Sequence, residues 1–191
     1  MRAPANRAAT TEGAPPELIR AAFRDLHGTR LHGFALLVTL GDRARAARLT
    51  AEALAAGMAR AAELRHPERA AAWLRRRITR AAERGGGTVR RRSADEDRQA
   101  LAELGVDAAI FAGLSGLTTR QRAALVADSI ERLDRGDVAT VVGINGARLD
   151  RLIRSVRARY AVAVAHALDD ESAADGPTAA RLRAVAARAL T

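Results

Sequence analysis

Apolar residues recur at helical spacing along most of this chain. After Pro15–Pro16, which can open a helix, an i, i+3, i+4 rhythm runs through Leu18, Ile19, Ala22, Phe23 and Leu26. No segment alternates with the period of a strand. The pattern therefore predicts an all-α fold, and further helices are expected over about 29–40, 43–64 and 67–84.

Glycine and capping signals divide the chain into segments. Gly85–Gly87 end the helix over 67–84 and begin "GGGTVRRR", which has the composition of a flexible basic linker. Ser93-x-x-Glu96 and Thr118-x-x-Gln121 each match a capping box at a helix start. We predict two small helical domains joined by a flexible linker: a disordered leader (1–15), a helical domain (16–84), the linker (85–106), a helix-turn-helix domain (107–166), and an acidic turn with a C-terminal helix (167–191).

Two outcomes are open for the last segment. A helix is predicted from Pro177 to Leu190, with Leu182, Val185 and Leu190 on its apolar stripe. A helix of about 14 residues is marginal alone in water, so this one either docks on the protein or remains frayed. Docking would also allow the acidic turn "DDESAADG" to lie against the arginine-rich first half of the chain.

The segment Asp137–Tyr160 has the pattern of a helix-turn-helix. Gly143 permits a tight turn, and Asn145 can cap the helix that follows. On a helical wheel that helix offers Arg151 and Arg154 on the face opposite its apolar arc, which holds Leu149, Leu152, Ile153, Val156 and Tyr160. Such a helix presents its N-terminal half to the major groove of DNA. An ordinary helical hairpin with a solvated basic face fits the same pattern.

The charge of the chain favours a polyanionic partner. The formal net charge is +10, and every basic residue apart from histidine is arginine. Residues 1–92 hold 19 arginines and 8 acidic residues, whereas residues 93–191 hold 13 and 14. Arginine forms planar, bidentate contacts with phosphate and guanine, so nucleic acid is the simplest partner for this excess.

Other chemistry has little support in the sequence. Without cysteine, disulfides and thiolate metal sites are excluded, and the four histidines lack ligand partners at suitable spacing. No catalytic constellation or phosphate-binding loop is present, so we expect neither an enzyme nor a cofactor or metal site. No run resembles a signal peptide or a membrane span, which predicts a cytoplasmic protein with no membrane partner.

Two stretches resemble extracytoplasmic-function sigma factors of bacterial RNA polymerase. The segment Leu114–Tyr160, with "LTTRQRAAL", "DVATVVGI" and the closing "RARY", is similar to region 4 of that family. Phe23–Leu54 and "HPERAAAWLRRRITRAA" (His66–Ala82) resemble region 2, and the order of the segments agrees. The resemblance implies an alternative sigma factor that directs the polymerase to specific promoters. A sigma-derived DNA-binding regulator that does not initiate transcription, and a pure protein-interaction module, are the alternatives.

The resemblance also assigns roles to residues. The partners it implies are promoter DNA, the core polymerase through the coiled coil of its largest subunit and its flap, and an anti-sigma factor. Trp73, on the helix that meets the −10 element, is expected in the core or as a base-stacking residue. The upstream element would be read by Asn145, Arg148, Arg151, Arg154 and Ser155. The −10 element would be bound by Arg76, Arg77, Arg80 and Arg84, and the polymerase by Asp42, Leu49, Glu52 and Leu54.

Overall fold

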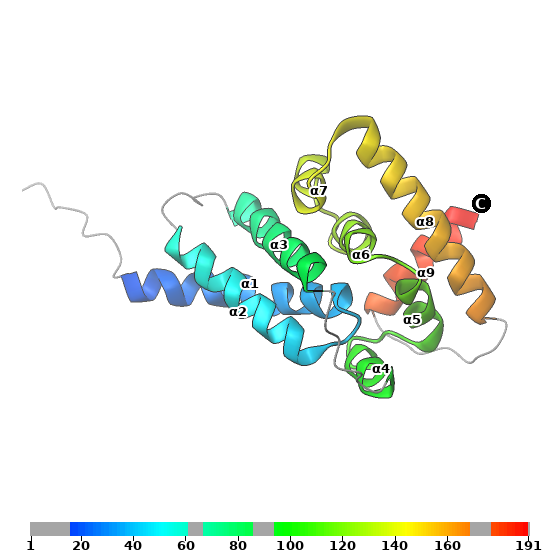
Figure 1. Cartoon of the computed structure of the whole chain (residues 1–191), viewed down its shortest axis with the longest axis horizontal. Coiled ribbons are helices and arrows are strands. Elements are labelled where there is room, and N and C mark those ends of the chain that lie inside the picture. The colour runs from blue at the N-terminus through cyan, green and yellow to red at the C-terminus, as the bar shows by residue number, and fades with distance from the viewer. Residues whose placement is uncertain (1–15, 61–66, 86–93, 169–176, 191) are drawn as a thin grey trace, which may run out of the picture.

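The computed structural model describes residues 16–60, 67–85, 94–168 and 177–190 (Figure 1). Every regular element in these ranges is helical and none is a strand, which confirms the all-α prediction. The elements are α1 (Pro16–Val38), α2 (Arg43–Ala59), α3 (Pro67–Arg84), α4 (Ala94–Ala102), α5 (Ala108–Ser115), α6 (Thr119–Leu125), the π-helix η1 (Val126–Ile130), α7 (Arg135–Val142), α8 (Gly146–Leu168) and α9 (Pro177–Leu190). The predicted leader (1–15) and residues 86–93 of the predicted linker (85–106) lie outside these ranges, whereas residues 94–102 of that linker form α4.

Helix α1 is one continuous helix, whereas the pattern predicted two with a break between Leu26 and Thr29. That prediction is wrong. Gly28 lies inside α1, where a side chain would meet nothing within 4 Å. An interior glycine costs a helix roughly 0.5–1 kcal/mol, whereas burying one large apolar side chain contributes about 1.5–3 kcal/mol. Leu31 and Phe34 are both buried on the continuation of the helix, so packing outweighs the glycine.

The turn between α1 and α2 requires glycine at position 41. Gly41 has φ 86°, and a Cβ there would lie 2.1 Å from the Asp97 carbonyl oxygen of α4. Asp42 then caps α2 by accepting a hydrogen bond from the Arg45 N–H at 2.9 Å. Helix α2 ends at Ala59, earlier than the predicted end near residue 64.

Capping signals set the helix ends in the second half. The Gln121 N–H donates to Thr118 Oγ1 at 3.3 Å, and the Thr118 N–H donates to Gln121 Oε1 at 2.9 Å. These two bonds confirm the predicted capping box. Beyond α6 the chain continues as the π-helix η1, which the hydrophobic pattern did not indicate. Arg132 follows η1 with φ 54°, a left-handed conformation that is uncommon for residues other than glycine.

The helices of the two predicted domains pack against each other. Helices α1–α3 lie on one side of α6 and α7, while α5, α8 and α9 lie on the other (Figure 1). Contacts join α3 to α6 and α7, and α1 to α6. The buried apolar residues of both halves belong to one continuous cluster. Because the described helices of both halves share this cluster, the structure does not confirm two separate domains, and that division stays a prediction.

Two buried arginines cross from one half to the other. Arg75 of α3 donates from Nε and Nη2 to the two carboxylate oxygens of Glu131, at 2.5 and 2.6 Å. Arg122 of α6 donates from Nε to the Val38 carbonyl at the end of α1, at 2.8 Å. An unpaired buried charge or carbonyl is costly, so these bonds fix how the halves meet.

The C-terminal helix docks on the second half. Helix α9 contacts α8, η1 and α5, and Leu182 and Val185 are buried. Arg183 forms an ion pair with Asp107, the N-cap of α5. Of the two outcomes open for this segment, docking is confirmed for α9. The acidic turn before it (169–176) lies outside the described residues, so its predicted contact is untested.

Candidate nucleic-acid interface

A short helix and a long helix meet at a left-handed glycine. Asp134 caps α7 by accepting a hydrogen bond from the Asp137 N–H at 2.7 Å. Gly143 ends α7 with φ 74°, which lets the chain reverse within three residues before α8 begins at Gly146. Val138 and Val142 of α7 are buried against the core. The local geometry is that of a tight helical hairpin, which is common to both readings of this segment.

The inward face of α8 is the predicted one. Leu149, Ile153, Val156 and Tyr160 are all buried, at exposed fractions of 5% or less. Leu152 is half-buried at the edge of this face. Because the apolar arc is held by the core, the opposite side of α8 is fixed toward solvent.

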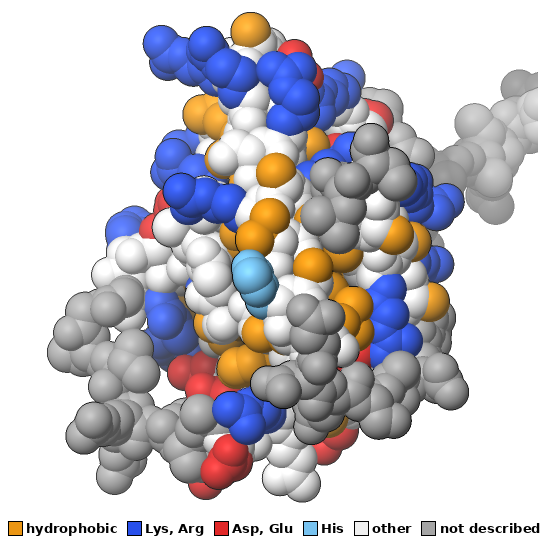
Figure 2. Space-filling model, turned by 90° about the vertical axis from the view of Figure 1, so that its right-hand side faces the viewer, with side chains coloured by type: hydrophobic (Ala, Val, Ile, Leu, Met, Phe, Trp, Pro, Cys, Tyr) orange, Lys and Arg blue, Asp and Glu red, His pale blue; other side chains and the backbone are white. Residues whose placement is uncertain are grey.

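The solvent side of α8 carries a group of exposed arginines. Arg148, Arg151 and Arg154 are exposed, and none has an ion pair or hydrogen bond within the described ranges. Figure 2 shows basic side chains gathered over the upper end of the molecule, the end at which α8 begins in Figure 1. Asn145 and Ser155 are exposed next to them, so the five predicted residues are brought to one surface.

Other arginines of this hairpin are held by acidic side chains. Arg157 donates to Asp128 at 2.6 Å, and Arg135 is paired with Asp150. These pairs lie on the side of α8 that faces η1 and α7. The arginines in them are therefore structural, unlike the exposed arginines on the solvent side. The prediction missed Arg159, which is exposed and lies four residues beyond Ser155, on the same helical face as Arg148. Its spacing in the sequence was the available signal.

The predicted arginine row on α3 is split by the fold. Arg77, Arg80 and Arg84 are exposed along one side of the helix. Arg76 is half-buried, and its Nη1 donates to the Thr140 carbonyl of α7 at 2.8 Å. Arg76 is therefore engaged by the protein itself, which leaves three arginines of this row facing solvent.

Trp73 lies on the same side of α3 as the exposed arginines. Its ring is half-buried and packs against the core. The guanidinium of Arg77 lies 5.2 Å from the ring centroid and that of Arg60 lies 5.5 Å from it. Each separation is within the range of a cation–π contact. Trp73 thus supports the arginines at the edge of this basic surface.

The residues assigned to polymerase binding do not form one exposed face. Leu49 and Leu54 are buried in the core at exposed fractions of 4% and 8%. Asp42 is half-buried and caps α2, and Glu52 alone of the four is exposed. The two leucines are thus unable to touch a partner in this conformation. The resemblance placed both leucines on this helix, where they lie, but assigned them to a partner-binding face, whereas both side chains face the core.

In the part of the chain that the structure describes, no group of three His, Asp or Glu side chains is placed to hold a metal ion. No helix of that part is both long and apolar enough to cross a membrane.

Comparison with protein-family models, with curated proteins and with solved structures finds no significant match to this chain. The geometry of the basic surfaces is therefore the ground for a functional proposal.

Proposed function

We propose that this chain is a DNA-binding protein of bacterial transcription, acting in the cytoplasm as an alternative sigma factor that directs RNA polymerase to specific promoters. One observation carries the DNA-binding part. Arg148, Arg151 and Arg154 project from a helix whose opposite face is buried, and no acidic side chain of the described residues neutralises them. Free arginines on a rigid helix, behind a tight turn, suit insertion into the major groove.

The two basic surfaces suit different contacts. The N-terminal half of α8 would read base edges, since an arginine can donate two hydrogen bonds to guanine. Arg77, Arg80 and Arg84 of α3 lie on an exposed surface and would bind phosphates, whose contacts carry no sequence information. In a sigma factor the second surface would meet the −10 element, with the core polymerase and an anti-sigma factor as protein partners.

A regulator that does not initiate transcription is the second candidate. It is favoured by the burial of Leu49 and Leu54, because a polymerase-binding face built on them would require α2 to move. The hydrogen bond from Arg76 to the Thr140 carbonyl also holds the two basic surfaces in one assembly. Two promoter elements that are farther apart on the duplex than the two surfaces are in the protein would not both be reached while that interface is closed. A sigma factor would have to open it on the polymerase, whereas a regulator would not.

Fluorescence anisotropy with labelled genomic duplex fragments tests DNA binding. Arg151→Ala should weaken binding to the preferred fragment by about 1–3 kcal/mol and relax the preference, because it removes a base contact. Arg24→Ala is the matched control, because Arg24 is exposed on α1 and the substitution removes the same charge far from α8. Equal effects of the two substitutions would contradict the recognition role of α8.

Salt dependence tests the second surface. Reversing Arg77, Arg80 and Arg84 to glutamate should weaken binding to all fragments alike. It should reduce the slope of log K against log salt by up to about 2.7, because each lost phosphate contact removes about 0.9. Co-purification with core polymerase and in vitro transcription then separate the candidates. Promoter-dependent transcripts support a sigma factor, and DNA binding without them supports the regulator.

A further inference from the structure

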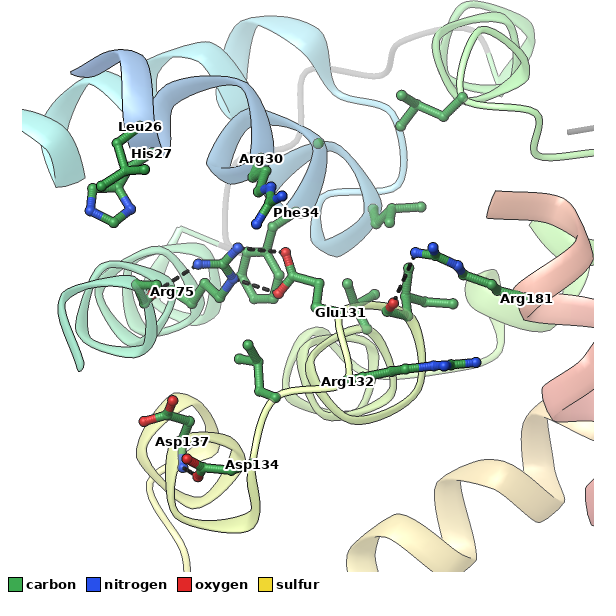
Figure 3. Close-up of a pocket in the computed structure, with 17 residues that line it drawn as sticks. Leu26, His27, Arg30, Phe34, Arg75, Glu131, Arg132, Asp134, Asp137 and Arg181 are labelled. Atoms are coloured by element: carbon green, nitrogen blue, oxygen red, sulfur yellow. Dashed lines mark hydrogen bonds and ion pairs between the residues drawn. The ribbon is translucent and has the colours of Figure 1, made fainter. Parts of the chain in front are cut away.

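An open cavity of about 710 Å³ lies where the two halves meet. Its walls come from α1 and α3 on one side and from η1, the turn after it, α7 and α9 on the other (Figure 3). This volume lies within the range of small-molecule sites, about 300–1,000 Å³.

The polar groups of the cavity are unevenly distributed. The Arg75–Glu131 pair lies at its centre, and its two charges neutralise each other (Figure 3). Arg30 extends from α1 toward that pair, and Arg181 enters from α9 with Nη1 donating to the Ile130 carbonyl at 3.3 Å. Neither Arg30 nor Arg181 has an ion pair within the described ranges. Arg132, in the turn after η1, also lines the cavity, so three arginines here carry charges that no acidic side chain of the described residues pairs with.

The acidic groups lie at another end. Asp134 and Asp137 sit together at the start of α7, away from Arg30 and Arg181 (Figure 3). The Asp134 carboxylate accepts the hydrogen bond from the Asp137 N–H that caps α7. An anion entering the cavity would thus be attracted to the arginine end and repelled from the α7 end.

Apolar surface completes the cavity. Phe34 and Leu37 are buried in its wall, Leu133 is half-buried, and Leu26 is 58% exposed at its rim. His27 lies beside Leu26, and burial together with the charge of Arg75 lowers its pKa, so the imidazole is neutral near pH 7. A ligand body resting here would meet hydrocarbon and a neutral ring.

We propose that this cavity binds a small amphipathic anion, with a carboxylate, sulfonate or phosphate held by Arg30 and Arg181 and an apolar body lying against Leu26 and Leu133. The wall is built from both halves of the chain, so such a ligand contacts both at once. Binding requires neither DNA nor polymerase, and the test below is therefore independent of the proposed function.

Fluorescence titration of the full chain with 8-anilinonaphthalene-1-sulfonate, an aromatic anion of suitable size, tests the site. We expect saturable binding of one probe per chain. Arg30→Ala should weaken binding of the probe about tenfold, the usual effect of losing a charge-assisted hydrogen bond. Because Arg30 is exposed and outside the core, the substitution should leave the fold intact. The uncharged analogue N-phenyl-1-naphthylamine should bind both proteins equally. Leu26→Gln should weaken both probes.

The matched control is Arg24→Ala, which removes an exposed arginine of α1 with no role in the cavity. It should leave both affinities unchanged. Equal loss in Arg24→Ala and Arg30→Ala would show general charge attraction and overturn the proposal. Absence of saturable binding, or many sites per chain, would overturn it as well. Circular dichroism of each variant checks that the fold is kept.

Discussion

Replacing the buried arginine of α6 should destabilise the whole fold. Only 8% of Arg122 is exposed, and its guanidinium donates to the Val38 carbonyl at 2.8 Å and to the Leu117 carbonyl at 2.5 Å. Arg122→Met keeps a long side chain but removes these two bonds, together with two longer ones of 3.4 Å to the Leu114 carbonyl and to Thr119 Oγ1. A buried acceptor without a partner costs about 1–3 kcal/mol, so two would cost about 2–6 kcal/mol.

An opposing effect reduces this cost. Burial, with the charge of Arg45 adding to it, lowers the pKa of Arg122 to about 10, so the folded state already disfavours the charged guanidinium. Methionine removes that desolvation penalty. The net loss should be about 2–4 kcal/mol, equivalent to a fall in Tm of about 4–16 °C for a chain of this size.

Urea and thermal unfolding followed by circular dichroism measure the effect. Arg120→Met is the matched control, because Arg120 lies two residues earlier on α6 and its side chain is 48% exposed. It pairs with Glu83 at 2.8 Å, and exposed pairs contribute at most about 1 kcal/mol. Similar unfolding free energies for Arg122→Met and Arg120→Met would refute the reasoning that Arg122 fastens the two halves together.

Four further predictions concern the second half. Tyr160 is buried, and among the described residues its hydroxyl has no hydrogen-bond partner, so Tyr160→Phe should raise the unfolding free energy by up to about 1–2 kcal/mol in urea titrations. Burial also raises the pKa of Tyr160, so above about pH 10 the unfolded chain releases its proton first; the wild type should lose stability there, and the phenylalanine variant should lose less. Gly113→Ala would place a Cβ 2.6 Å from the Tyr160 ring, and the resulting strain of about 1–3 kcal/mol should exceed the 0.5–1 kcal/mol gained in helix propensity, which thermal unfolding can check. Truncation after Leu168 removes the buried Leu182 and Val185 and should lower Tm in the same assay; an unchanged Tm would contradict docking of α9.

Local signals predicted much of the helical structure. Helix α3 and helix α9 begin and end where proline, glycine and the apolar rhythm placed them. The capping box at Thr118 formed as expected, because both of its partners lie within one turn. The predicted break between Leu26 and Thr29 does not form, because a glycine inside a helix can be tolerated when the next turns are buried. That burial depends on tertiary structure.

The candidate site was predictable only in part, for the same reason. The inward face of α8 follows from spacing alone, so the exposure of Arg151 and Arg154 could be read from the sequence. The hydrogen-bond partners of Arg75 and Arg76 could not be predicted from the sequence, because they lie 56 and 64 residues away along the chain. Nothing local distinguishes an arginine that pairs with Glu131 from one that faces solvent.

The docking of α9 has a consequence for how the chain matures during synthesis. This helix leaves the ribosome after every other described helix, yet Leu182, Val185 and Ala186 complete the packing of the second half. Until they emerge, α5, α8 and η1 present an uncovered apolar surface. In the same way, the face of α1 that contacts α6 stays uncovered until α6 has been made. Newly made chains that lack α9 should therefore expose the apolar surface of α5, α8 and η1 and be recognised by chaperones and proteases, so docking of α9 protects the second half.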